Sequence, residues 1–340
     1  MQMQTQTSSP EVSSLRAVAT GRRARSVLIT GADGYVGRLV TARLAATRGE
    51  LKHIVATDLR ATPQSRQLAG VDYDAVDIRA PSLGEAMAAY DVDTVIHLAA
   101  VVTPKPGDDR AFQYGVDVEG TANVIRACLE HGVGRFIYTS SGAAYGYSDH
   151  NPALLKEDEP LRADEAFAYS WHKRLVEEML AEARQAHPEL EQVVLRVSTV
   201  LGETVANQIT AMFERPAVVG IAGAPSPFCF IWDQDLAACI VEAVRGGNPG
   251  VFNITGDGVM TLREIASAMG RPYLPLRADL VARVIGLLHA RGLSPYGPEQ
   301  VRFLSHRPVL CNRRLKREFG FVPSLTSRQV FERYRRSRLG

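Results

Sequence analysis

Cysteine is scarce in this 340-residue sequence, and the cysteines present are widely spaced. The four of them, Cys128, Cys229, Cys239 and Cys311, lack both the CxxC spacing of zinc sites and the regular pattern of a disulfide framework. The sequence therefore predicts neither a metal site nor a disulfide scaffold. A reducing, cytoplasmic location fits this cysteine usage best.

Long apolar runs and an excess of charge are lacking as well. No run of about 18 uncharged apolar residues occurs; the nearest, Leu280 to Leu288, is interrupted by Arg283 and predicts an amphipathic helix. The formal net charge is only +2, which leaves little basic charge to attract nucleic acid or anionic lipid. We expect a small-molecule substrate as partner, and neither a nucleic acid nor a membrane.

Residues 1–24 differ in composition from the rest of the chain. They are rich in Gln, Ser and Thr, become basic at Arg22 and Arg23, and lack the apolar core of a signal peptide. We interpret them as a disordered leader. The sequence as a whole is 46% hydrophobic, which is enough to build a sizeable core.

From Ser26 onward, short β-branched apolar runs alternate with helical segments, which predicts an α/β fold with a doubly wound, parallel Rossmann-type sheet. The predicted strands are 26–30, 53–58, 72–76, 94–98, 135–140 and 192–197, with helices such as 34–47 and 120–131 between them. We expect an NAD-binding domain over 25–202, to which 230–255 returns through a strand at 251–254. Residues 203–229 and 256–340, with helical periodicity at 261–269 and 326–338, are expected to form a smaller C-terminal substrate-binding lobe.

The first predicted strand runs into a glycine-rich turn and then a helix. In a dinucleotide-binding turn, one glycine permits the tight bend, a second lets the backbone approach a pyrophosphate, and a third lets helix and strand pack closely. Gly31, Gly34 and Gly37 are spaced for these three roles. Glycines also mark ordinary turns, so the strand and helix on either side carry the interpretation.

Asp58 strengthens the cofactor interpretation. It ends the second predicted strand, about 20 residues beyond the glycine motif, where a carboxylate accepts hydrogen bonds from the adenosine ribose. A carboxylate there repels a 2′-phosphate and favours NAD over NADP, although Arg60 softens that preference. The alternative is that Asp58 only caps a turn at the end of its strand.

Five motifs occur in order along the chain: TGADGYVG at 30–37, DI at 77–78, HLAA at 97–100, YTSSGAAYG at 138–146 and YSWHK at 169–173. Together they resemble the extended short-chain dehydrogenase/reductases, a group that includes nucleotide-sugar epimerases, dehydratases and 3β-hydroxysteroid dehydrogenases. The resemblance implies a homodimer formed through the helices at 120–131 and 168–182. It also implies cofactor contacts from Tyr35, Val36, Asp77, Ile78, Leu98, Ala99 and Ala100, besides the three glycines, Asp58, Tyr169 and Lys173.

Tyr169, Lys173 and Ser141 are the candidate catalytic residues. Tyr169 would exchange a proton with the substrate oxygen while hydride passes between the adjacent carbon and the nicotinamide. Lys173 lies one helical turn away, where its ammonium favours the phenolate, and Ser141 at a strand end would orient the substrate oxygen. The YxxxK spacing alone also occurs by chance on helix surfaces, and a pair of serines at a strand end is also common in turns. His97, in an apolar strand, is interpreted as a hydrogen-bonded core residue.

Several positions depart from the family pattern. Dehydratases carry an Asp-Glu pair where this chain has Gly142 and Ala143, which argues against dehydration. Nucleotide-sugar enzymes have an asparagine at Thr199 and an arginine at Phe228, so a diphosphate site is weakened, unless Arg215 replaces that arginine. The segment 228–232 fits a core strand as well as a substrate wall. Asp117 stands where the family shows asparagine; it lacks the amide donor of a proton relay and could instead cap the next helix.

Three functions remain open. The leading hypothesis is an NAD-dependent oxidoreductase that moves hydride between NAD(H) and a secondary alcohol or ketone carbon of a non-nucleotide substrate. The second is a UDP-sugar 4-epimerase with tightly bound NAD. The third is an NAD(P)-binding regulator without catalysis, since dehydrogenase folds can support binding functions.

Overall fold

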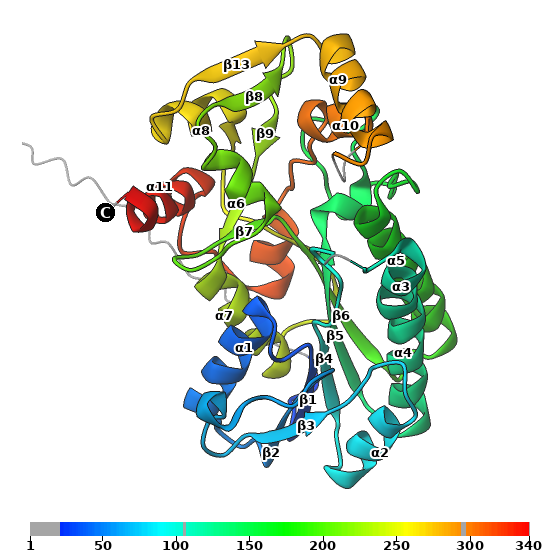
Figure 1. Ribbon diagram of the computed structural model, residues 1–340. Helices are drawn as coiled ribbons and strands as arrows, with labels where there is room; N and C mark the ends of the chain where they lie inside the picture. The colour runs from blue at the N-terminus through cyan, green and yellow to red at the C-terminus, as the bar shows by residue number, and fades with distance from the viewer. Residues whose placement is uncertain (1–20, 105–106, 294–296, 340) are drawn as a thin grey trace, which may run out of the picture.

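A seven-stranded parallel sheet forms the centre of the molecule, in a computed structural model that describes residues 21–104, 107–293 and 297–339 (Figure 1). Its strands, in spatial order, are β3 (Asp72–Ala75), β2 (His53–Asp58), β1 (Ser26–Thr30), β4 (Thr94–His97), β5 (Arg135–Ser141), β6 (Glu191–Val197) and β11 (Gly250–Ile254). Every neighbouring pair is parallel. The predicted doubly wound sheet is confirmed, including the returning strand.

Helices cover both faces of this sheet (Figure 1). Side chains of β1 alternate between the two faces: Val27 and Ile29 pack toward one hydrophobic core, and Leu28 packs toward the other. The first face is covered by α1 (Tyr35–Ala46) and α7 (Asp233–Val244). The second is covered by α2 (Ser82–Ala89), α3 (Arg110–Tyr114), the π-helical turn η2 (Gly115–Gly120), α4 (Thr121–Glu130) and α5 (Ala168–Ala186). A short η1 (Gln64–Arg66) lies between β2 and β3.

A smaller lobe sits above the carboxyl ends of the strands (Figure 1). It contains three two-stranded sheets. They pair β7 (Thr199–Leu201) with β10 (Phe230–Trp232), β8 (Val218–Ile221) with β13 (Tyr273–Leu276), and β9 (Pro227–Phe228) with β12 (Met260–Thr261). Its helices are α6 (Gln208–Phe213), α8 (Leu262–Ala268), α9 (Ala278–Ala290), α10 (Gln300–Ser305) and α11 (Ser327–Leu339). Its core centres on stacked and edge-on rings of Phe213, Phe228, Phe230 and Phe331.

The boundaries differ from the predicted ones at two places. Residues 21–24, placed in the predicted leader, contact the sheet domain: the Gly21 and Ala24 amides donate to the Gly246 and Val244 carbonyls. The rest of that leader lies outside the described residues. The π-helical η4 (Leu315–Phe319), placed in the C-terminal lobe by sequence, packs instead on the core between the sheet and α7.

Within the described ranges, every helix is too short or too polar to cross a membrane. The segment predicted as an amphipathic helix is α9, and most of its apolar side chains are exposed. The four cysteines are all buried, unpaired thiols.

Candidate active site

The glycine turn follows the carboxyl end of β1, next to β4. At this point in the sheet the order of the strands reverses direction. Ligands of open α/β sheets bind in the crevice at this point. Gly31 has a φ of +69°, and a Cβ added there would lie 2.7 Å from the Ala99 amide nitrogen. A Cβ on Gly37 would collide with the Gly31 carbonyl oxygen. Both glycines are therefore required by geometry, as the close packing of a dinucleotide-binding turn demands.

Asp58 faces the same turn from the end of β2. Its Oδ2 accepts a hydrogen bond from the Asp33 amide at 3.0 Å, and its Oδ1 accepts one from the Leu59 amide at 2.8 Å. Asp33 in turn lies 3.3 Å from the Arg66 guanidinium. The carboxylate of Asp58 thus braces the glycine turn, at the position predicted for an adenosine-binding acid.

Tyr35 and Val36 begin α1 directly after the turn. The Tyr35 hydroxyl donates to the Asp233 carboxylate at 2.6 Å, and burial together with this bond raises the pKa of Tyr35. Val36 packs on the core beneath the helix. Any cofactor contact from these two residues therefore falls to their backbone amides, which belong to the helix's unpaired first turn.

The other predicted cofactor residues border the crevice from β3 and β4. The Leu98 and Ala99 amides donate to the carbonyl and hydroxyl of Thr30, which places 98–100 beside the glycine turn. Ile78 is buried against Gly120. Asp77 receives hydrogen bonds from Arg79, and these hold the pKa of Asp77 below its usual value.

Ser141, Tyr169 and Lys173 meet at the carboxyl end of β5. The Ser141 hydroxyl is close enough to Tyr169 to act to lower its pKa, and the Lys173 Nζ lies 5.8 Å from the centroid of the Tyr169 ring. Ser140 points the other way, with its hydroxyl 2.5 Å from the Glu177 carboxylate. The alternation of side chains along β5 therefore brings Ser141, not Ser140, to Tyr169.

Burial dominates the ionisation of this group. It raises the pKa of Tyr169, and the Ser141 hydroxyl opposes that rise only in part. Burial thus opposes the phenolate-favouring effect that the sequence predicts for Lys173. Burial also lowers the pKa of Lys173 to about 8, while the carboxylates of Asp117 and Glu177 act to raise it. Lys173 donates to the Thr139 carbonyl at 2.8 Å and to the Tyr138 hydroxyl at 3.0 Å, a partner that the motif reading missed.

Asp117 is part of a buried pair. The sequence suggests a different role, as a cap of the next helix. It lies in η2, where its Oδ2 is 2.9 Å from His172 Nδ1 and its Oδ1 accepts a hydrogen bond from the Val101 amide. Both side chains are at most 5% exposed. His172 directly precedes Lys173, so the pair connects the loop after β4 to the catalytic helix. Inserted π-helical turns are common at functional sites, but the sequence carries no clear signal for them.

His97 is a hydrogen-bonded core residue in the structure. Its ring nitrogens lie 2.7 Å from the Thr30 hydroxyl and 2.9 Å from the Thr121 hydroxyl. Burial lowers the pKa of His97 to about 3, so the ring is neutral near pH 7. Thr121 donates to the Asp117 carbonyl, which links β1, β4 and η2 through one polar chain.

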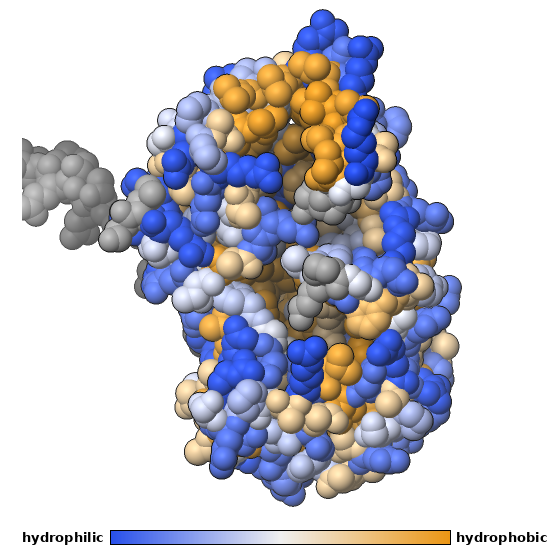
Figure 2. All heavy atoms as spheres, viewed as in Figure 1, coloured by the Kyte–Doolittle hydropathy of each residue, from blue (hydrophilic) through white to orange (hydrophobic). Residues whose placement is uncertain are grey.

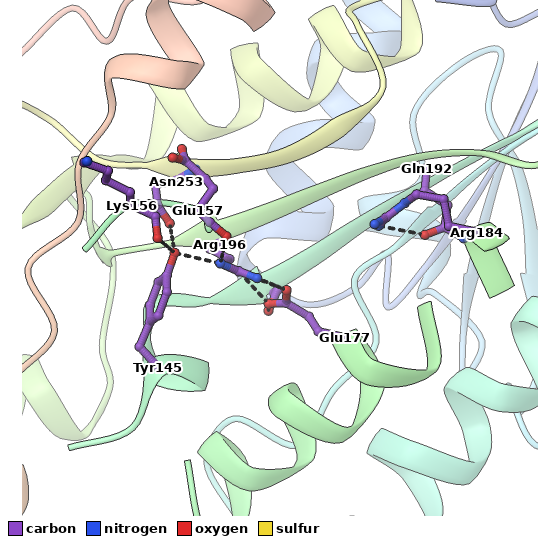
Figure 3. Close-up of polar contacts among 9 residues, drawn as sticks. Tyr145, Lys156, Glu157, Glu177, Arg184, Gln192, Arg196 and Asn253 are labelled. Atoms are coloured by element: carbon purple, nitrogen blue, oxygen red, sulfur yellow. Dashed lines mark hydrogen bonds and ion pairs between the residues drawn. The ribbon is translucent and has the colours of Figure 1, made fainter. Parts of the chain in front are cut away.

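A buried ion pair anchors α5 behind the candidate catalytic residues (Figure 3). The Arg196 guanidinium of β6 contacts the Glu177 carboxylate at 2.7 Å, with both side chains at most 7% exposed. Arg196 also donates to the hydroxyl of Tyr145, which belongs to η3 (Gly142–Tyr145) directly after Ser141. In Figure 3 this network joins α5, β6 and the turn after β5 around one arginine.

Thr199 and Phe228 are joined by an arginine that the sequence reading did not select. The Arg307 guanidinium lies 3.8 Å from the centroid of the Phe228 ring and 4.4 Å from that of Phe303, and its Nη2 is 3.5 Å from the Thr199 hydroxyl. Its Nη1 is buried without a hydrogen-bond partner. Phe228 itself is buried in the core strand of the lobe, whereas Arg215 is exposed beyond α6. A positive group thus lies beside Phe228, the aromatic residue that stands where the family has an arginine.

Comparison with known proteins places the chain among epimerases and dehydratases. The sequence model of the NAD dependent epimerase/dehydratase family matches residues 27–255. An uncharacterized protein of Mycobacterium tuberculosis is 27% identical over 316 residues, covering 92% of this chain and 84% of the relative. N-acetyl-alpha-D-glucosaminyl-diphospho-ditrans,octacis-undecaprenol 4-epimerase of Escherichia coli O157:H7 is 33% identical over 184 residues, covering 52% of this chain and 50% of that enzyme.

Solved structures agree on the fold. A UDP-glucose 4-epimerase from Thermotoga maritima, solved with UDP-glucose, superposes with a TM-score of 0.71 at 18% identity, covering 93% of this chain and all of that one. The Bordetella bronchiseptica enzyme WbmG, solved with NAD and UDP, superposes with a TM-score of 0.70 at 20% identity, covering 94% and 95%. At these identities the likeness concerns the fold.

Proposed function

The chain belongs to the NAD-dependent epimerase/dehydratase family, whose members are enzymes of the extended short-chain dehydrogenase/reductase type, and we propose that it transfers hydride between NAD(H) and a secondary alcohol or ketone carbon. The observation that carries the proposal is the convergence of Ser141, Tyr169 and Lys173 at the end of β5, beside the glycine turn. Membership of an enzyme family also removes the main support for a regulator without catalysis.

In this proposal each residue has a distinct task. When bound, NAD accepts or returns the hydride. The Tyr169 hydroxyl takes the proton from the substrate alcohol or gives it to the ketone, and the Ser141 hydroxyl orients the same oxygen. Lys173 supplies a positive charge next to Tyr169 and donors for the nicotinamide ribose. Gly31, Gly34 and Gly37 let the backbone approach the pyrophosphate, and Asp58 selects NAD over NADP.

Dehydration does not fit the residues that follow Ser141. Gly142 and Ala143 have no acid or base to remove water from a sugar. The chemistry left to the site is therefore reversible oxidation at one carbon. A net oxidoreductase on a non-nucleotide substrate and a 4-epimerase both use that step.

Arg307 bears on the choice between these two functions. Leaving the Nη1 of Arg307 buried and unpaired is costly unless a ligand supplies an anion. We therefore propose that the substrate carries a phosphate or carboxylate that contacts Arg307 and Thr199. Thr199 and Phe228 by themselves weaken a diphosphate site. The positive charge of Arg307 supports such a site and so favours the second candidate, a 4-epimerase acting on a diphosphate-linked sugar.

One panel of reactions separates the candidates. Purified protein is incubated with NAD or NADP and with simple alcohols, ketones, hydroxy acids and UDP-sugars, while NADH formation and sugar interconversion are followed. Net NADH from an alcohol supports the oxidoreductase, whereas interconversion of UDP-sugars without net NADH supports the epimerase. The homodimer formed through α4 and α5 and the cytoplasmic location remain predictions. Sedimentation velocity tests the former.

A further inference from the structure

An apolar stripe runs along the exposed side of α9. Leu280, Val284, Leu287 and Leu288 are 50%, 50%, 56% and 39% exposed, and Leu293, just beyond the helix, is 70% exposed. These positions recur every three or four residues and so form one stripe, whereas Val281 is the buried residue of the helix. Figure 2 shows this end of the molecule as a broad hydrophobic area bordered by hydrophilic atoms. Contiguous apolar surface of this kind indicates a binding surface.

Arginines flank this stripe. Residues 271–293 contain Arg271, Arg277, Arg283 and Arg291 but a single acidic residue, Asp279. Asp279 is paired with Arg277 at 3.1 Å. Arg283 and Arg291 are exposed on α9 and directly after it, and the Arg291 Nη1 donates to the Leu287 carbonyl at 3.4 Å. The segment is therefore locally basic, although the whole chain is nearly neutral.

The charges decide which partner fits the face. A two-fold contact between two copies would bring two copies of the same basic patch together, because the same surface occurs on both sides of such an interface. Nucleic acid would satisfy the arginines but leave the leucines in water. A bilayer surface with anionic headgroups satisfies both, since the leucines enter the acyl boundary and the arginines contact lipid phosphates.

We propose that α9 is an interfacial helix that docks this enzyme onto anionic membrane surfaces, lying in the headgroup plane and not spanning the bilayer. The helix contacts α10, whose Phe303 ring stacks on Arg307. Docking would therefore bring the membrane to the rim of the proposed substrate site. The inference concerns the surface alone and holds whether the reaction is a net oxidation or an epimerisation.

Vesicle binding by the full chain tests the proposal. The protein is sedimented with vesicles of phosphatidylcholine, or of equal parts phosphatidylglycerol and phosphatidylcholine. We expect binding to the mixed vesicles that weakens as salt is raised. Leu287→Ser and Leu280→Ser should each reduce the partition coefficient about tenfold, and Arg283→Gln and Arg291→Gln about fivefold each. Val322→Ser and Arg43→Gln, at exposed positions away from α9, serve as controls and should bind normally.

The same variants exclude the other partners. All substituted side chains on α9 are exposed, so circular dichroism should show folded protein, and the arginine variants test the proposal even if a leucine variant misfolds. No binding to the mixed vesicles would overturn the proposal. So would sedimentation velocity showing a dimer that Leu287→Ser dissociates, because the face would then join two copies. Equal loss of binding in the control variants would also contradict it.

Discussion

Replacing Glu177 by glutamine should destabilise the fold strongly, because it leaves Arg196 buried without a counter-charge. Glu177 accepts hydrogen bonds from Ser140 and Arg196 in a network that is closed to solvent (Figure 3). Glutamine keeps the size of the side chain but removes its charge. Breaking a buried pair by removing one partner costs about 3–5 kcal/mol.

The next residue in the chain provides a matched control. Glu178 forms an exposed ion pair with Arg174 on the same helix, with side chains 47% and 37% exposed. Pairs of this type contribute about 0.3–0.5 kcal/mol. Glu178→Gln should therefore change stability about tenfold less than Glu177→Gln, a ratio that follows from burial alone.

Urea unfolding followed by fluorescence of Trp171 and Trp232 measures both effects. A variant in which Glu177 and Arg196 are both methionine should recover much of the lost stability, because neither charge is then left unpaired. If Glu177→Gln lowered the free energy of unfolding no more than Glu178→Gln, the buried pair of Glu177 and Arg196 would not anchor α5.

Three further predictions concern the site itself. NAD affinity, measured by fluorescence titration, should fall as the pH rises through about 8, where Lys173 loses its charge, and Lys173→Met should remove that dependence. Asp117→Asn removes a carboxylate that raises the pKa of Lys173, so the fall should move to lower pH, while Glu119→Gln at an exposed neighbour leaves it in place. Arg307→Leu should keep or raise the melting temperature of the free protein but weaken UDP binding at least about tenfold, judged by thermal shift, with Arg215→Leu unchanged.

Much of the sheet domain could be predicted from sequence because its signals are local. Most strands of the sheet contain a short apolar run, and the glycine turn needs residues without a Cβ at defined steps, as the Gly31 and Gly37 contacts show. Tyr169 and Lys173 are about one helical turn apart in the sequence, so their side chains lie on the same face of the helix. Side chains alternate between the two sides of β5, and this alternation places the Ser141 side chain toward Tyr169.

The substrate side could not be predicted in the same way, because it depends on contacts between distant segments. Arg307 reaches Phe228 and Thr199 only after the C-terminal lobe has folded over the sheet. Asp117 in the π-helical η2 contacts His172 in α5, and these two residues lie far apart in the sequence. The effect of burial on Tyr169, which raises the pKa of this phenol, could not be predicted for a related reason, since burial is a property of the whole fold.

The most direct test of the account compares Tyr169→Phe with the unaltered chain on whichever substrate of the panel reacts. Removing the hydroxyl deletes the group proposed to exchange the proton, while the half-buried ring and the glycine turn stay in place. We expect the rate of hydride transfer to fall about a hundred- to ten-thousandfold with NAD binding unchanged. An unchanged rate in Tyr169→Phe would contradict the central claim that Tyr169 is the acid/base of this site.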